Sequence, residues 1–288
     1  MGAGREEQFM IIDLHTHSLV SDGTDRPAEV MRRAARLGVD VIALTDHDTF
    51  SGHAEAEAAA HEMGIEFVPG MEMSTTLGGR SVHLLAYGAD TSHAPLLEEL
   101  ERIRRGRTER VPRMVARLEE LGVPITVEDV IARAGGDSVG RPHVADALVA
   151  AGHVADRAEA FNRYLHDGGL AHVGKYESPL PEAIDLLHDA GAVTVIAHPW
   201  GRGSRDVLDG DTIGRLARDH RLDGIEIDHG DHGPRDSAMR GELRSIARTH
   251  GLLVTGSSDY HGTGKVGHEI ASETTAPGVW ERIRARMT

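Results

Sequence analysis

The stretch IIDLHTHSLVSDGT, residues 11–24, concentrates side chains that can bind a metal ion. His15, His17 and Asp22 lie within eight residues, after a short apolar run. Alternate residues of a β-strand face the same side, so Asp13, His15 and His17 share one face if the strand extends that far. Two imidazoles on one face of a strand end can clamp a metal ion, although a lone H-x-H pair is a weak signal.

The same residue types recur near other predicted strands. The apolar segments predicted as strands are residues 9–15, 40–45, 66–70, 81–88, 192–198, 224–228 and 252–259. The ligand-type residues beside or within them are His47, Glu72, His83, His198, Asp259 and His261. Most follow carboxyl ends of strands, where parallel α/β folds build active sites, whereas His83 falls inside its strand. A cluster of carboxylates and imidazoles without cations is costly, so the group predicts a metal centre.

The elements between these strands predict how the side chains are positioned. Helices are expected from Pro27 to Gly38, over residues 52–63, and from Pro181 to Gly191. Their alternation with strands predicts a parallel sheet, open or closed into a barrel. The alternation fails between about residues 95 and 175, where only helical periodicity is visible. The predicted domains are therefore a first barrel part at 9–95, a helical insertion or cap at 96–175, and a second barrel part at 176–288.

Composition narrows the class of protein. The 288 residues are enough for a full core, and a net charge of -15 disfavours a stable complex with long nucleic acid. The absence of cysteine excludes disulfides, thiolate metal sites and a cysteine nucleophile. The N-terminal MGAGREEQ lacks an apolar signal core and no apolar run approaches membrane-spanning length. We therefore expect a cytoplasmic protein without a membrane partner.

A family resemblance joins these motifs. The segments DLHTHSLVSDGT, ALTDHDTFSG, PGMEMS, VHLLAYG, AHPW and GSSDYHG occur in an order that resembles the PHP (polymerase and histidinol phosphatase) family, which is related to the amidohydrolase superfamily. The resemblance runs through both ends of the chain and skips only the helical segment. It implies a distorted TIM-like barrel of seven βα units, (βα)7, with two or three divalent metal ions.

The resemblance also implies a ligand for each metal position. One ion is assigned to His15, His17, Glu72 and Asp259; a second to Glu72, His83 and His198; a third to Asp22, His47 and His261. Mixed imidazole and carboxylate ligands without thiolate suit manganese, iron or zinc, and the sequence does not choose among them.

Such a centre predicts hydrolysis of a phosphoester by metal-bound hydroxide. Asp259 is expected to orient or deprotonate the water while ligating metal, and His229 to donate a proton to the leaving alkoxide. No G-x-x-x-x-G-K-[ST] loop or G-x-S-x-G elbow is present, so nucleoside-triphosphate hydrolysis and serine-esterase chemistry have little support.

Substrate contacts are expected from the helical segment. The segment GRPH resembles one that reaches the substrate phosphate in PHP phosphoesterases acting on nucleotides, which implies phosphate contacts for Arg141 and His143. Lys175 is a further candidate, with an ordinary surface lysine as the alternative. For Arg141 and the proline after it, the alternative is a simple helix start. The arginines between residues 102 and 113 are expected on a solvated helix face beside glutamates.

The leading hypothesis is a phosphatase for a nucleotide or short oligonucleotide, resembling the 3′,5′-nucleoside bisphosphate phosphatases and 5′-3′ exoribonucleases of the family. One alternative is a cyclic phosphodiester hydrolase of the same family. Histidinol phosphatase is disfavoured by the RPH-containing segment. A non-catalytic PHP module is a different class, whose marks are missing ligands or an attached polymerase domain. The sequence leaves the oligomeric state open.

Overall fold

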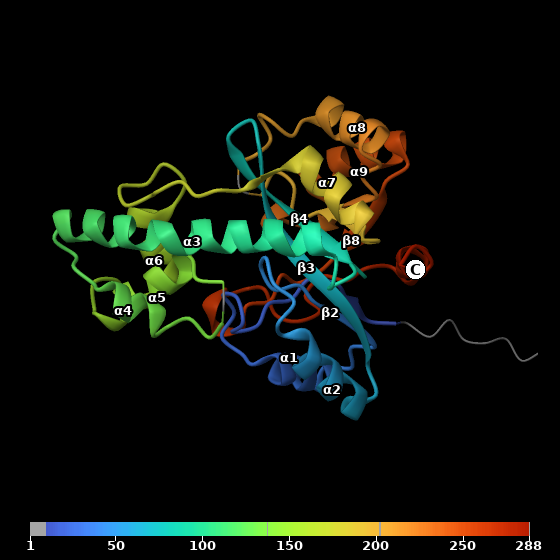
Figure 1. Cartoon of the computed structure of the whole chain (residues 1–288). Coiled ribbons are helices and arrows are strands. Elements are labelled where there is room, and N and C mark those ends of the chain that lie inside the picture. Colours follow the sequence, from blue (N-terminus) through green and yellow to red (C-terminus); the bar gives the residue numbers. More distant parts are fainter. Residues whose placement is uncertain (1–9, 137, 202, 288) are drawn as a thin grey trace, which may run out of the picture.

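The computed structural model describes residues 10–136, 138–201 and 203–287 (Figure 1). Residues 9 and 288, which bound the predicted domains, lie outside the described residues. The strands are β1 (Ile12–Asp13), β2 (Val41–Leu44), β3 (Glu66–Leu77), β4 (Arg80–Tyr87), β5 (Ser178–Pro179), β6 (Val193–Ile196), β7 (Gly224–Asp228) and β8 (Leu253–Gly256). The helices and short helical turns are α1 (Pro27–Arg36), α2 (His53–Met63), α3 (Ala94–Glu120), α4 (Val127–Ile131), α5 (Arg141–Ala150), α6 (Arg157–Ala160), η1 (Phe161–Leu165), α7 (Leu180–Asp189), α8 (Gly210–Asp219), η2 (Gly230–His232), α9 (Ala238–His250), η3 (Gly262–Gly264) and α10 (Pro277–Arg284).

The strands form one mixed sheet in the order β1-β2-β3-β4-β6-β7-β8, with β5 paired to β3. The pairs on either side of β4 are parallel, but β4 runs antiparallel to both β3 and β6. The prediction of a parallel sheet is therefore wrong for β4. The reason is the two-residue turn at Gly78 and Gly79, because so short a connection can join only antiparallel strands.

The two ends of this sheet meet at the segments that follow β1 and β8. His17 N donates to Tyr260 O at 2.8 Å, and Asp259 N donates to His15 O at 2.9 Å. The sheet is thus a nearly closed, barrel-like sheet whose last main-chain pairing is made by predicted metal ligands. This closure places His15 and His17 beside Asp259, although nearly the whole chain separates them in sequence.

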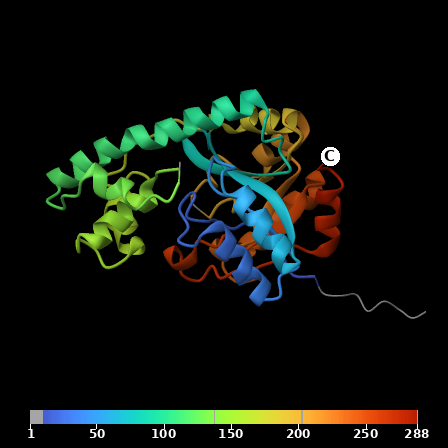
Figure 2. The ribbon, with the colours of Figure 1, turned by 60° about the horizontal axis from the view of Figure 1, so that its bottom comes forward.

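Helices cover the barrel-like sheet on its outside (Figure 2). One core cluster joins β3 and β4 to α7, α8, α9 and the first half of α3, and another joins α1 and α2 to β2. A third contains strand residues such as Ile12 and Val195 together with Trp280 and Ile283 of α10. The apolar core therefore holds the strands rigidly, as a site built at their ends requires.

The segment between β4 and β5 is helical, with no strand among its described residues. Figures 1 and 2 show α4, α5 and α6 beside the far end of α3, away from α7 and α9. These helices have an apolar cluster of their own, in which Met114 and Leu118 of α3 meet Val144 and Leu148 of α5. Over the described residues, no helix combines the length and apolar character needed to cross a membrane.

Candidate metal centre

The structure brings the nine predicted metal ligands together. All nine are buried, and their ligand atoms form overlapping groups or ion pairs. Glu72 was predicted just past a strand that ends at Gly70. This placement is wrong, because β3 continues to Leu77 and pairs with β4 from Gly70 onward. His47 follows β2 and forms a parallel bridge with Glu72.

The first cluster joins His15, His17, Glu72 and Asp259. The Nε2 atoms of His15 and His17, Glu72 Oε2 and Asp259 Oδ1 are separated by 3.0–3.5 Å in five measured pairs. Ligand atoms around one ion with tetrahedral bonds of about 2.0–2.1 Å are separated by about 3.3–3.4 Å. These four atoms therefore fit a single divalent cation.

Unpartnered polar atoms support the same interpretation. Glu72 Oε2, Asp259 Oδ1 and His47 Nδ1 are buried and have no hydrogen-bond partner among the described residues. Buried polar atoms without a partner are costly, and cations bound in these clusters would satisfy them. Burial raises the pKa of the Glu72 carboxyl, but His83, His47 and His15 hold this pKa well below its ordinary value. Burial also holds the pKa of His47 well below its ordinary value, so both groups are in the protonation state that metals require.

The second cluster shares Glu72 with the first. Its other carboxylate oxygen, Oε1, lies 2.7 Å from His83 Nδ1 and 3.1 Å from His198 Nε2. His47 Nδ1 lies 3.2 Å from Glu72 Oε2, so His47 also borders this cluster. The carboxylate of Glu72 is therefore placed to bridge two cations.

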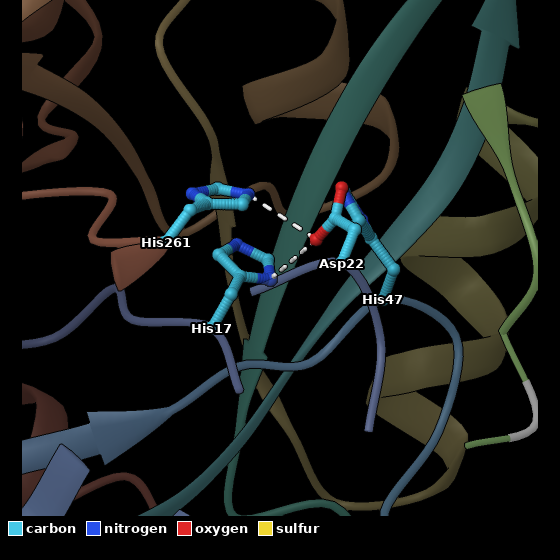
Figure 3. A group of neighbouring side chains, drawn as sticks. All are labelled: His17, Asp22, His47 and His261. Atoms are coloured by element: carbon cyan, nitrogen blue, oxygen red, sulfur yellow. Dashed lines mark ion pairs between the residues drawn. The ribbon is translucent and has the colours of Figure 1, made fainter. Parts of the chain in front are cut away.

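The third cluster surrounds Asp22 (Figure 3). Asp22 Oδ1 lies 3.2 Å from His261 Nε2 and 3.7 Å from His17 Nδ1, while Oδ2 lies 3.6 Å from His47 Nε2. The wider spacing leaves room for a cation among three imidazoles and one carboxylate. The assigned ligands Asp22, His47 and His261 thus meet, with His17 beside them.

Comparison with known proteins agrees with this geometry. The PHP domain model matches residues 13–124. The 3′,5′-nucleoside bisphosphate phosphatase of Chromobacterium violaceum is 34% identical over 96% of this chain and 97% of its own length. The 5′-3′ exoribonuclease of Haemophilus influenzae is 35% identical over 94% of this chain and 98% of its own. The chain belongs to the PHP family.

Two further similar proteins extend the comparison. The phosphoribosyl 1,2-cyclic phosphate 1,2-diphosphodiesterase of Eggerthella lenta is 32% identical over 90% of this chain and 97% of its own. The crystal structure of a predicted metal-dependent phosphoesterase from Bifidobacterium adolescentis superposes with a TM-score of 0.90 at 34% identity and covers 98% of both chains. The enzyme class predicted from the sequence, a metal-dependent hydrolase of phosphoester bonds, is confirmed, and the non-catalytic module is set aside.

Glu226, a carboxylate behind the ligands, was missed in the sequence. Glu226 of β7 is fully buried, with Oε1 3.2 Å from His15 Nδ1, and Oε2 accepts from His198 N. The sequence signal that could have revealed it is its position between two isoleucines of a predicted strand, which indicates a buried carboxylate. Asp13, expected on the face of His15 and His17, instead accepts from Ser258 N because β1 ends at Asp13. Glu226 is therefore placed to orient His15 and His198 from behind the centre.

His229, the predicted proton donor, lies fully buried beside Asp259. Its Nε2 is 3.2 Å from Asp259 Oδ2, and its Nδ1 accepts from Asp231 N. Lys265 Nζ lies 2.5 Å from the same Oδ2 atom. His268, also missed in the sequence, is grouped with His229 and Asp259. Oδ2 of Asp259 thus contacts His229 and Lys265, while Oδ1 lies in the first cluster.

A cavity of about 620 Å³ opens between the β3–β4 hairpin and the helical segment, and its described lining includes none of the nine ligands. Arg110, Arg141 and Lys175 line it, and Ser81 borders both this cavity and a small hollow lined by His83 and His198. Arg141 begins α5, as its simplest interpretation predicted, and pairs with Asp167 at 2.5 Å.

His143 is placed differently from Arg141. Among the described residues, the lining of the cavity does not include His143. Its ring is buried, and its Nδ1 accepts from Gly140 N at the start of α5. Burial lowers the pKa of His143, and the neighbouring charge of Asp22 opposes that shift. His143 therefore lies on the Asp22 side of the site.

The structure contradicts the surface-lysine alternative for Lys175 and part of the expectation for the arginines of α3. Lys175 is no surface lysine, because only 7% of its side chain is exposed and its Nζ donates to Glu177 at 2.7 Å. The arginines expected on a solvated helix face are exposed at positions 102, 105 and 113. Arg107 and Arg110, by contrast, are buried. Their spacing of three places them on the helix face that docks against the hairpin and the helical segment.

Proposed function

We propose that this chain hydrolyses a phosphate monoester of a nucleotide or short oligonucleotide at a centre of three divalent ions. The proposed ligands are His15, His17, Glu72 and Asp259 for the first ion, Glu72, His83 and His198 for the second, and Asp22, His47 and His261 for the third. The PHP resemblance supports a distorted (βα)7 barrel, residues 9–95 and 176–288, that carries a helical insertion at 96–175.

The chain's own residues orient the reactants. Divalent ions, when bound, lower the pKa of water and offset the charge of phosphoryl oxygens. We propose that Asp259 orients or deprotonates the water, since His229 and Lys265 fix its Oδ2. Because Nδ1 of His229 accepts a hydrogen bond, the neutral ring carries its proton on Nε2. This Nε2–H would donate to Asp259 Oδ2 and orient the carboxylate, and the proton that Asp259 removes from the water would pass to the leaving oxygen.

The observation that carries the proposal is the cationic cavity beside the clusters. Nε of Arg110 is buried and has no hydrogen-bond partner among the described residues. Burial and the neighbouring Arg141 lower the pKa of Arg110 to about 9. An anionic group in this cavity would offset the positive charges of Arg110 and Arg141. Guanidinium groups bind phosphate with two hydrogen bonds. We propose Arg110, Arg141 and Lys175 as phosphate contacts there, and His143 as a contact on the Asp22 side.

Two positive regions suit a substrate with two phosphates. One phosphate would lie at the metal clusters and be hydrolysed, and the other would lie in the cavity. The relatives that act on 3′,5′-nucleoside bisphosphates and on RNA from the 5′ end support this substrate class. A nucleotide substrate is also consistent with the cytoplasmic location expected from the sequence.

A cyclic phosphodiester is the second candidate substrate, and the similarity to the Eggerthella enzyme favours it. Phosphate release from adenosine 3′,5′-bisphosphate, a 5′-phosphorylated dinucleotide and a small cyclic phosphodiester tests both. We expect the highest kcat/KM with the bisphosphate or the dinucleotide. A kcat/KM highest for the cyclic compound contradicts the proposal. His15→Ala, His47→Ala and Asp259→Ala should abolish most turnover, whereas Arg105→Ala, on the exposed face of α3, should not.

A further inference from the structure

Two arginines of the helical segment contact the loops that carry ligands of the third cluster. Arg157 of α6 donates from Nη1 to the carbonyl oxygen of Asp22 at 2.9 Å, while its Nε and Nη2 bind Asp146 at 2.6 Å each. Arg107 of α3 donates from Nε to Asp48 Oδ2 at 2.7 Å. Asp48 directly follows the ligand His47. Both arginines therefore join the helical segment to the main chain beside a predicted ligand.

The backbone at Asp48 needs such support. Its φ is 57°, a left-handed conformation that is unfavourable for a residue other than glycine. Asp48 Oδ1 accepts from Ser74 N at 2.6 Å, and Arg107 Nη2 donates to Ser74 Oγ at 2.5 Å. Arg104 adds a bond from Nη1 to the Asp48 carbonyl at 2.7 Å. The carboxylate of Asp48 thus lies between β3 and α3, and both elements fix the direction of His47.

The Asp22 loop is packed equally closely. A Cβ atom on Gly135 or Gly136 would collide with Leu19 or the carbonyl of Val20, just before Asp22. These glycines belong to the helical segment between α4 and α5. Only glycine permits this approach, so the segment covers the Asp22 loop directly.

The loop of His261 is also reached from the helical segment. A Cβ atom on Gly264 would collide with the guanidinium of Arg157. By contrast, His15 is held by Glu226, and Asp259 by Lys265 and by pairing with the strand end at His15. Direct support from the helical segment is thus concentrated on the third cluster.

We propose that docking of the helical segment assembles the third metal position, with Arg107 and Arg157 as its positioning residues. The first two positions are built by the barrel-like sheet and form without this docking. The cation at Asp22, His47 and His261 is then coupled to the cap that covers the substrate. This inference rests on the three ion positions proposed above.

The test is Mn²⁺ binding to metal-free protein, measured by elemental analysis after gel filtration and by titration calorimetry. Wild type should bind three ions per chain. Arg107→Ala and Arg157→Ala should weaken one ion by about 10- to 100-fold and leave two unchanged. Arg105→Ala on α3 and Arg163→Ala beside α6, both exposed, are matched controls that should keep all three.

The outcomes separate this inference from the proposed function. Three ions bound with wild-type affinity in both variants, or an equal weakening of all three, overturns the inference while the function stands. Wild type that binds fewer than three ions overturns the inference and the three-ion assignment together. Melting of the metal-free proteins shows that each variant is folded, and Arg157→Gln is a milder variant for the same measurement. A purely structural role would not remove one ion selectively.

Discussion

Glu226 shows how a single buried carboxylate prepares a metal ligand. Its Oε1 lies 3.2 Å from His15 Nδ1, so the ring proton resides on Nδ1 and leaves Nε2 for the first cluster. Burial raises the pKa of Glu226, but His15 outweighs this and holds the pKa at about 2. The ligands themselves were predicted from residue type, from their places near strands and from the PHP resemblance, whereas Glu226 depends on which face of β7 turns inward.

We predict that Glu226→Gln lowers metal affinity or kcat by about 10- to 100-fold, because it keeps the shape but loses the charge that orients His15. Calorimetric titration with Mn²⁺ and phosphate release measure the two effects. Glu242→Gln, an exposed change on α9, is the control. A Glu226→Gln protein with wild-type metal affinity and kcat would disprove this role.

The buried Lys175 leads to a prediction about how KM depends on pH. Burial, then the charge of Arg107, lowers its pKa to about 8. Phosphate binding needs the ammonium form, so KM should rise as pH increases through about 8. Lys175→Arg, which stays charged, should move this rise to higher pH. Steady-state kinetics across this range are the measurement, and a KM curve identical in both proteins would refute the assignment.

At the scale of elements, the β3–β4 hairpin depends on its turn. Gly78 and Gly79 have φ values of +55° and +79°, as the tight primed turns of hairpins require. Nothing lies within 4 Å of a Cβ built on Gly79, so Gly79→Ala should lower the free energy of unfolding by backbone strain alone, about 1–2 kcal/mol. Gly278→Ala, in α10 and equally open, should raise it by about 0.5–1 kcal/mol. Urea denaturation measures the free energy of unfolding of both variants. Equal changes in the two would contradict the role assigned to the turn.

The sequence predicts most elements, because apolar runs and helix ends are local signals. The helix expected from Pro27 is α1, and the strand expected at 224–228 matches β7. Strand direction and length are not local, so the antiparallel β4 and the extension of β3 past Gly70 were missed. Helical periodicity likewise shows that arginines surround α3, but not that Arg107 and Arg110 face a docking surface.

At the scale of the whole molecule, distant segments converge on one pocket. The ligands come from both ends of the chain, and closure of the sheet by His17 and Tyr260 brings them together. The net charge of -15 repels an anionic substrate at long range, so attraction must come from the cavity and the cations. The proposed phosphate site would therefore depend on buried arginines in a protein whose net charge is negative.

The most direct test of the central claim is elemental analysis of the purified protein, paired with phosphate release from adenosine 3′,5′-bisphosphate before and after chelation. We predict divalent ions bound in stoichiometric amount, loss of turnover on their removal, and recovery on adding Mn²⁺. Undiminished turnover by fully metal-free protein, or a protein that binds no divalent ion, would contradict it.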